Sequence, residues 1–377
     1  MTFENLNLKQ SLLDSVKREG YQTPTAIQFQ SIPHILNGKD ILGCAQTGTG
    51  KTAAFALPLL QLIMQDKSTA KYRGIQALIL APTRELAIQI NESFKAYGKG
   101  TGLVNTCIYG GVKQAAQVSI LKRGVDILIA TPGRLLDLLQ QRIIELDTIR
   151  YFVLDEADRM LDMGFIDDIK KIIRRLPEKK QTILFSATIV PEIRKLASSM
   201  MNKPVSVSVT PEVMESSLID QSVYYVKKEF KRQLLNHVIQ HDSIDNALVF
   251  TRTKHGADKV AKDLNKNGIK AEAIHGNKSQ NNRERTMKGF KNGSIRILVA
   301  TDVASRGIDI DKLSHVINFE IPETATTYVH RIGRTGRAGT KGIALSFCSV
   351  DEKVYMGNIS KLIKKDIHVV RAHPFNS

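Results

Sequence analysis

The sequence has 377 residues, of which 42% are hydrophobic and 24% are charged, and its formal net charge is +17. This composition excludes a disordered chain and favours two globular domains, and no apolar run reaches the roughly 20 residues of a membrane span. Three isolated cysteines exclude a disulfide or metal-cluster framework. The first residues lack a secretory signal pattern, so we expect a cytoplasmic protein. The basic excess is +8 up to residue 208 and +9 after it, which predicts that both halves contact a polyanion.

Short apolar segments of strand length alternate with longer segments of helical period along the chain. They are rich in Ile, Leu and Val, which is typical of parallel strands that helices cover on both faces. The predicted strands are 40–44, 77–81, 126–130, 152–154 and 182–185 in the first half, and 247–250, 271–274, 297–300, 315–319 and 344–348 in the second. The sequence therefore predicts an α/β protein with two mostly parallel sheets, whose functional residues lie at the carboxyl ends of the strands.

The segment Ala-Gln-Thr-Gly-Thr-Gly-Lys-Thr, from Ala45 to Thr52, follows the first predicted strand and precedes a helical segment. Gly48 and Gly50 allow backbone N–H groups to turn towards phosphate oxygens. Lys51 supplies a positive charge to the β- and γ-phosphates, and Thr52 supplies a hydroxyl to Mg²⁺. Ala45 stands where such loops usually have their first glycine. The order of strand, loop and helix predicts a nucleotide site rather than a chance turn.

The predicted strand 152–154 ends in Asp155-Glu-Ala-Asp158. Adjacent carboxylates repel each other, so this cluster indicates a bound cation or a proton-transfer role more than a solvated loop. We expect Asp155 to hold Mg²⁺ and Glu156 to orient or deprotonate the attacking water.

The segment between the two halves contains Pro204 and Pro211 and has no helical period. We therefore predict an N-terminal domain at residues 1–209, a linker at 210–219 and a C-terminal domain at 220–377. In the second half, His330-Arg-Ile-Gly-Arg-Thr-Gly-Arg337 contains three arginines within seven residues. These arginines repel one another unless they face an anion.

With Asp155-Glu-Ala-Asp158 placed after such a phosphate loop, the chain resembles the DEAD-box RNA helicase family, and the resemblance extends from Phe3 to the final basic helix. It implies two tandem RecA-like domains, each a mostly parallel sheet flanked by helices. It also implies ATP and Mg²⁺ as cofactors and RNA bound through its backbone with little sequence specificity. RNA-stimulated ATP hydrolysis would then drive lobe closure, strand bending and local unwinding of short duplexes.

The resemblance assigns candidate site residues in groups that share a role. The nucleotide would contact Phe3, Tyr21, Thr23, Gln28, Ala45, Gln46, Thr47, Gly48, Thr49, Gly50, Lys51, Thr52 and Asp309. Catalysis would use Lys51, Asp155, Glu156, His330, Arg334 and Arg337, with Thr52 and Asp155 at the metal. RNA would contact Pro82, Thr83, Arg84, Gly110, Gly111, Thr131, Pro132, Gly133, Arg134, Arg252, Thr301 and Arg306. Hydrolysis would be coupled to unwinding by Asp158, Ser186 and Thr188.

Three of these roles have a simple chemical reason. The amide of Gln28 can pair with a donor and an acceptor on adenine, and either Tyr21 or Phe3 offers the base a flat surface. Arg334 and Arg337 resemble arginine fingers that reach the γ-phosphate. Hydroxyls, glycine N–H groups and guanidinium groups suit phosphate and ribose oxygens.

Short segments refine the resemblance. Residues 1–6 and 348–353 and the Lys-Leu-Ile-Lys-Lys at 361–365 are similar to the bacterial RhlE-like branch, which implies a role in ribosome assembly or RNA turnover. Two alternatives remain. One is a DNA translocase with the same two-lobe engine, against which the Gln28 element and Asp155-Glu-Ala-Asp158 argue. The other is a nucleotide-gated RNA clamp, which shares every motif and whose slow hydrolysis serves only release. We expect a monomer that has no membrane association and no metal cluster, and the sequence names no protein partner.

Overall fold

The computed structural model describes residues 2–46, 48–69, 74–209, 219–242, 244–302, 313–336, 341–363 and 366–375. The chain divides into two compact units, residues 1–211 (unit 1) and 212–377 (unit 2). The predicted linker at 210–219 lies outside the described residues except for Ile219. That residue is the first of a strand in unit 2 rather than the end of a linker.

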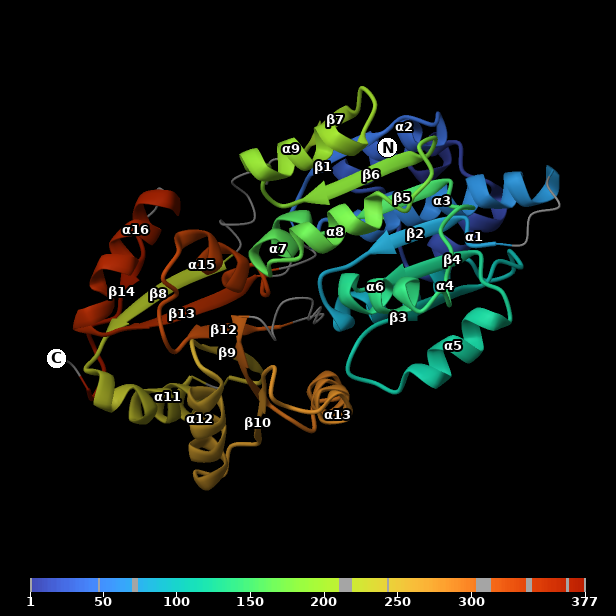
Figure 1. Ribbon diagram of the computed structural model, residues 1–377. Coiled ribbons are helices and arrows are strands. Elements are labelled where there is room, and N and C mark those ends of the chain that lie inside the picture. The colour runs from blue at the N-terminus through green and yellow to red at the C-terminus, as the bar shows by residue number, and fades with distance from the viewer. Residues whose placement is uncertain are drawn as a thin grey trace. The chain divides into compact units, whose positions relative to one another are not determined.

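Unit 1 is built on a seven-stranded parallel sheet in the order β3-β4-β2-β5-β6-β1-β7 (Figure 1). The strands are β1 (Ile41–Cys44), β2 (Ala77–Leu80), β3 (Asn105–Ile108), β4 (Ile127–Ala130), β5 (Tyr151–Leu154), β6 (Gln181–Ser186) and β7 (Val205–Ser208). All residues of β2, β4, β5 and β6 are buried, as predicted for strands covered on both faces. The sequence analysis missed β3 and β7, which are the partly exposed edge strands.

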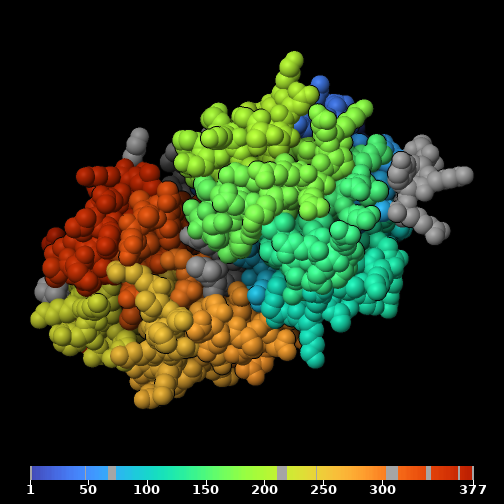
Figure 2. Space-filling model, in the orientation of Figure 1, coloured from blue at the N-terminus to red at the C-terminus, as the bar shows by residue number. Residues whose placement is uncertain are grey.

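Helices cover both faces of this sheet. They are α1 (Gln10–Arg18), α2 (Ala26–Leu36), α3 (Lys51–Thr69), α4 (Arg84–Tyr97), α5 (Gln114–Lys122), α6 (Pro132–Gln140), α7 (Ala157–Asp162), α8 (Ile166–Ile173) and α9 (Pro191–Met200), after the 3₁₀ turn η1 (Phe3–Leu6). Along β2, Ile79 packs into the cluster of α1 to α4, whereas Leu78 and Leu80 pack into the cluster of α6 to α9. The alternation of side chains along a strand thus divides the core into two layers. In Figure 2, the green and yellow-green segments that contain α8 and α9 form much of the visible surface of unit 1.

Unit 2 repeats the same architecture. Its parallel sheet has the order β10-β11-β9-β12-β13-β8-β14, which becomes the order of unit 1 when the strands are numbered within each unit. The strands are β8 (Ile219–Tyr225), β9 (Ala247–Thr251), β10 (Ala271–Ile274), β11 (Ile297–Thr301), β12 (His315–Asn318), β13 (Gly342–Cys348) and β14 (His368–Val369). The helices are η2 (Lys228–Phe230), α11 (Lys231–His241), α12 (Lys254–Lys266), α13 (Gln280–Lys291), α15 (Ala325–Ile332), η3 (Val350–Glu352) and α16 (Lys353–Ile363). All five strands predicted for this half are present, and β8 and β14 were missed.

The predicted fold class is confirmed, because both units are parallel sheets flanked by helices. Several helices begin at the carboxyl end of a strand with a side-chain cap, so the chain enters them at a defined angle. Thr83 accepts a hydrogen bond from an N–H of α4, Thr253 from α12 and Thr324 from α15.

Within the described part of the chain, no helix combines the length and apolar character needed to cross a bilayer.

Candidate nucleotide and nucleic-acid site

The loop between β1 and α3 has the backbone that phosphate binding needs. Gly48 and Gly50 have φ values of +89° and +90°, in the left-handed region that glycine tolerates best. The Thr49 hydroxyl donates to the carbonyl of Gln46 at 2.8 Å and closes the loop from inside. Thr47 lies outside the described residues. The loop is therefore an open turn at the start of α3, where N–H groups and the helix dipole favour an anion.

Ala45 replaces the usual first glycine without disturbing this turn. Its N–H donates to the carbonyl of Ser186 at 2.9 Å, which continues the pairing of β1 with β6, and its methyl group is buried. Ala45 thus belongs to the hydrogen-bonded end of β1 and not to the glycine turn that would face a phosphate.

Lys51 is the first residue of α3, and its side chain is buried beside Asp155. The Lys51 Nζ lies 3.9 Å from the Asp155 Oδ1, and it has no hydrogen-bond partner among the described residues. A buried ammonium group without an acceptor is unfavourable, and an anion placed against it removes that cost. Lys51 therefore fits a phosphate group at the mouth of the loop, as the sequence predicts.

Asp155 follows β5 directly and is buried. Burial raises the pKa of Asp155 to about 6, although the nearby Lys51 ammonium opposes this shift. A divalent cation at the carboxylate would favour its charged form. Mg²⁺ is commonly held by one or two protein groups together with phosphate oxygens and waters, and a buried carboxylate such as that of Asp155 is a donor that suits it.

Glu156 has an unusual backbone for a residue with a side chain, with φ +54° and ψ +52°. This left-handed conformation costs on the order of 1–3 kcal/mol and is common at functional sites. Its N–H donates to the Asp155 Oδ1 at 2.9 Å, and its carboxylate accepts from the Arg159 Nη1 at 2.5 Å. The sequence analysis missed Arg159, although the three-residue spacing of acid and base at a helix start indicates such a pair.

Asp158 connects the loop after β5 to the loop after β6. Its N–H donates to the Ser186 hydroxyl at 3.1 Å, and its carboxylate accepts from the N–H and the hydroxyl of Thr188 at 3.0 and 3.1 Å. The Ser186 hydroxyl in turn donates to the Thr188 carbonyl at 2.8 Å. The three residues predicted to act together in coupling are thus in direct contact, across about thirty residues of sequence.

Gln28 lies against the phosphate loop although it is 22 residues away in sequence. Its Nε2 donates to the Gly50 carbonyl at 3.1 Å, and its Oε1 accepts from the Thr25 N–H at 2.9 Å. A Cβ atom on Gly50 would lie only 2.4 Å from this Nε2, so Gly50 is required for contact as well as for φ. A primary amide has two N–H donors and two lone pairs, so these two bonds use one of each, and the Gln28 side chain is only 4% exposed.

The two aromatic candidates for the base differ in accessibility. Tyr21 is 41% exposed, and its hydroxyl shares a hydrogen bond of 3.1 Å with the hydroxyl of Tyr97. Phe3 is only 3% exposed and packs in the core with α1 and α2. The sequence offered either ring as the flat surface for the base. The ring of Phe3 is covered, so Tyr21 is the one that is accessible, and Thr23, two residues further along, is also exposed.

The candidate RNA contacts of unit 1 include a guanidinium stacked on a glycine pair. Arg84 begins α4, and a Cβ atom on Gly111 would lie 2.1 Å from its Nη1. Gly111 also has a φ of +79°, so two independent constraints favour glycine at this position. Gly110 borders the same guanidinium. The predicted contacts Arg84, Gly110 and Gly111 therefore form one local surface.

Arg134 has a different environment from the one expected. Its Nη1 donates to the Gln117 Oε1 at 2.9 Å, its Nη2 donates to the Val112 carbonyl at 3.2 Å, and its Nε lies 3.6 Å from the Asp137 carboxylate. These contacts hold the loop after Gly111, and the assignment of Arg134 to RNA stays a prediction. At the start of α6, Thr131 and Pro132 are buried and Gly133 is exposed.

In unit 2, the first arginine of the 330–337 segment finds its anion inside the protein. Arg331 forms a two-bond ion pair with Asp302, at 2.6 Å from Nε and 2.8 Å from Nη2. Its Nη1 donates to the Asn318 side chain and the Glu320 carbonyl, and its guanidinium lies 4.9 Å from the Phe250 ring centre. For Arg331, the anion that the sequence argument requires is thus a carboxylate of the protein itself. Sequence reasoning missed both Arg331 and Asp302.

Replacing Arg331 by alanine is expected to destabilise unit 2 by about 3–5 kcal/mol, because it removes the two bonds between Arg331 and Asp302 and opens a cavity. Denaturant unfolding measures this change. The matched control is Arg232→Ala, which removes an ion pair with Asp263 from a more exposed position and is expected to cost less than about 1 kcal/mol. Equal stability of the two variants would contradict the buried-pair interpretation.

Three other candidates of unit 2 lie within the described residues, two at or just after the end of a strand and one after a helix. Thr301 ends β11, and Arg334 follows α15 with its Nε donating to the His330 carbonyl at 3.3 Å. Arg252 follows β9, and its guanidinium is bound to Glu352 and to a backbone carbonyl. Arg306, Asp309 and Arg337 lie outside the described residues.

Comparison with known proteins adds independent findings. A family model described as DEAD/DEAH box helicase matches residues 25–196, and one described as helicase conserved C-terminal domain matches residues 230–339. The ATP-dependent RNA helicase CshA of Limosilactobacillus reuteri is 44% identical over 366 residues, covering 97% of this chain and 72% of that protein. The structure of S. cerevisiae Dbp5 bound to RNA and ADP BeF3 has a TM-score of 0.86 at 31% identity, covering 98% of this chain and 95% of that one. The DEAD-box helicase Mss116 bound to ssRNA and UDP-BeF has a TM-score of 0.88 at 30% identity, covering 99% and 81%.

Proposed function

Because this chain belongs to the DEAD-box family of ATP-dependent RNA helicases, we propose that residues of both RecA-like units act on one ATP and one RNA strand. Unit 1 carries the phosphate loop and the Asp155–Asp158 segment, and unit 2 carries the arginines of the 330–337 segment. Hydrolysis then depends on closure of the two units, and each ligand favours the closed state for the other. In this proposal, closure bends one strand and separates a short duplex.

The observation that carries the nucleotide half of the proposal is the buried Lys51 Nζ, which has no hydrogen-bond partner among the described residues and lies 3.9 Å from the Asp155 carboxylate. We assign Lys51 and the loop N–H groups to the β- and γ-phosphates. Thr52 and Asp155 would hold Mg²⁺, which supplies charge neutralisation at the transferred phosphoryl group. Glu156 orients or deprotonates the attacking water, and Arg334 and Arg337 stabilise the charge that develops during transfer.

For the RNA half, we propose that Arg84 and Gly110–Gly111 in unit 1 and Arg252, Thr301 and Arg306 in unit 2 contact phosphate and ribose oxygens. Such contacts position a strand without reading its bases. The pairing of Asp158 with Ser186 and Thr188 supports their assignment to coupling, since it joins the loop that holds Glu156 to the loop after β6.

The finer assignments rest on the sequence. We propose that the protein acts as a monomer in the cytoplasm, and that it belongs to the RhlE-like branch, with ribosomal RNA assembly or RNA turnover as its process. The relative described above carries the name CshA, so the branch stays a prediction.

Steady-state ATP hydrolysis with no nucleic acid, with single-stranded RNA and with DNA of the same sequence tests this function. We expect strong stimulation by RNA and much weaker stimulation by DNA, because contacts to the ribose 2′-hydroxyl require RNA. Equal stimulation by both would favour the DNA translocase alternative. Unwinding of short duplexes in the same buffer then distinguishes a helicase from a clamp, which would bind RNA without separating strands.

A further inference from the structure

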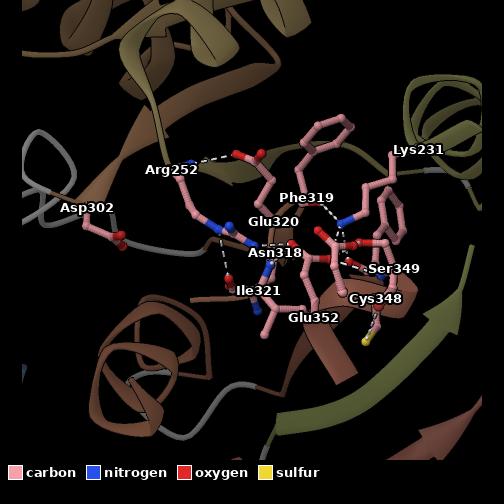
Figure 3. Close-up of polar contacts among 12 residues, drawn as sticks. Lys231, Arg252, Asp302, Asn318, Phe319, Glu320, Ile321, Cys348, Ser349 and Glu352 are labelled. Carbon is pink, nitrogen blue, oxygen red and sulfur yellow. Dashed lines mark hydrogen bonds and ion pairs between the residues drawn. The ribbon is translucent and has the colours of Figure 1, made fainter. Parts of the chain in front are cut away.

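A buried carboxylate in unit 2 collects hydrogen bonds from four separate places in the sequence. Glu352 is the last residue of η3 and is only 2% exposed. Its Oε2 accepts from the Lys231 Nζ at 2.5 Å and from the N–H and hydroxyl of Ser349 at 3.0 and 2.8 Å. Its Oε1 accepts from the Arg252 Nη2 at 2.5 Å and the Ile321 N–H at 3.1 Å. The two oxygens therefore have different partners (Figure 3).

Lys231 binds the Oε2 of this carboxylate and has a structural role. Its ammonium group is buried and also donates to the carbonyls of Phe319 and Phe347, at 3.0 and 2.7 Å. All three of its hydrogen bonds are thus satisfied inside the protein. Burial lowers the pKa of Lys231, and the Glu352 carboxylate opposes this shift. The ammonium group faces the interior, so it is not available to bind a ligand.

Arg252 binds the other oxygen of Glu352, Oε1, and is partly exposed. Its Nη2 binds Glu352, its Nε donates to the Ile321 carbonyl at 3.3 Å, and its backbone N–H donates to the Glu320 carboxylate at 2.7 Å. Its side chain is nevertheless 31% exposed. In Figure 3, Arg252 and Lys231 approach Glu352 from opposite sides. The guanidinium is thus held by Glu352 and Ile321 and lies 5.8 Å from the Tyr355 ring centre, while the side chain as a whole stays partly exposed just after β9.

We propose that Glu352 is a positioning residue for RNA binding: through its Oε1 it holds the guanidinium of Arg252 in the orientation that meets a phosphate of the RNA strand. An unrestrained arginine loses rotamer freedom when it binds, and a guanidinium already fixed by two hydrogen bonds avoids that loss. This inference rests on the proposed function, because it takes Arg252 as an RNA contact. It adds a residue that is not among the predicted nucleotide or RNA contacts.

The divided partners of Glu352 supply a test that separates positioning from simple stability. Glu352→Gln keeps the shape but turns one oxygen into an N–H donor, which must then face either Arg252 or Lys231. Lys231→Met and Ser349→Ala disturb only the Oε2 side and leave the bond between Arg252 and Oε1 in place. Both controls remove interior hydrogen bonds, so they report what loss of stability alone does.

The measurement is RNA-stimulated ATP hydrolysis as a function of RNA concentration, together with thermal unfolding of each variant. We expect Glu352→Gln to raise the KM for RNA by about tenfold. This factor corresponds to the loss of the charge-assisted hydrogen bond that holds the Arg252 guanidinium in place. The kcat at saturating RNA and the KM for ATP should stay within about twofold, because the phosphate contacts of unit 1 are untouched. Lys231→Met and Ser349→Ala should lower the unfolding temperature and leave the KM for RNA unchanged.

A double-mutant cycle completes the test. Arg252→Gln should raise the KM for RNA by a similar factor, and the variant with both Arg252→Gln and Glu352→Gln should be no worse than either alone, since both changes remove the same contact. Additive effects, or a Glu352→Gln variant whose KM for RNA matches that of Lys231→Met, would overturn the positioning role. If RNA failed to stimulate the unsubstituted protein, the proposed function would fall and this inference with it. Normal stimulation with equal variants would remove the inference alone.

Discussion

Replacing Glu156 by glutamine is expected to lower the rate of ATP hydrolysis by about 10²- to 10⁴-fold, because it removes the proposed base while keeping the shape of the side chain. The amide oxygen can still accept from the Arg159 Nη1, and the left-handed backbone of Glu156 can be kept, so ATP binding should survive. The protein should then remain closed on ATP and RNA together, since hydrolysis is the step that releases them.

The measurement has two parts: the steady-state rate of phosphate release, and the dissociation rate of a labelled RNA oligonucleotide with ATP present. Glu178→Gln is the matched control, because it makes the same chemical change at an exposed residue of unit 1. Slow hydrolysis combined with slow RNA release supports the role of Glu156. Rapid RNA release from the Glu156→Gln variant in ATP would contradict it.

Replacing Arg337 by alanine is expected to reduce hydrolysis by roughly 10³- to 10⁵-fold, the contribution of an arginine finger. ATP affinity should stay nearly intact, because Arg337 is assigned to the charge that develops in the transition state rather than to the ground state. The expected result is a large drop in kcat with little change in the dissociation constant of a non-hydrolysable ATP analogue.

Lys341→Ala is the control for Arg337→Ala, since it removes an exposed positive charge four residues further along the chain. It should leave kcat within about twofold, because the charge of a single exposed lysine contributes little. Comparison with Arg331→Ala adds a second contrast, because that variant is expected to lose stability as well as activity. Undiminished hydrolysis by Arg337→Ala at saturating RNA would exclude the finger role.

Local sequence patterns were sufficient to predict much of the secondary structure of this protein. The ten predicted strands are all present, because a run of Ile, Leu and Val buried on both faces leaves its mark in consecutive residues. The phosphate loop was also predictable, since its glycines answer a local backbone need that the φ values of Gly48 and Gly50 confirm. The coupling role of Asp158, Ser186 and Thr188 comes from the family resemblance and stays a prediction, and the structure shows that the three residues are in contact.

Edge strands were not predictable in the same way. β3 and β7 are partly exposed, and β14 has only two residues, so none of them carries a long apolar run. The strand β8 begins at Ile219, directly after a segment without clear period, and it was missed although it lies between β13 and β14. Such strands exist because a neighbouring strand offers unpaired N–H and carbonyl groups, and that requirement belongs to the sheet rather than to the segment.

The sequence by itself determined where the backbone turns and which residue types meet phosphate and metal, because those demands act between near neighbours. Only the tertiary structure decided which charged groups face inward. Arg331 turns to Asp302 and Arg134 to Gln117, while Glu352 holds Arg252 from one hundred residues away. A guanidinium has the same formula whether it meets RNA or a buried carboxylate. The choice depends on which acceptors folding brings within about 3 Å, and long-range packing alone sets that.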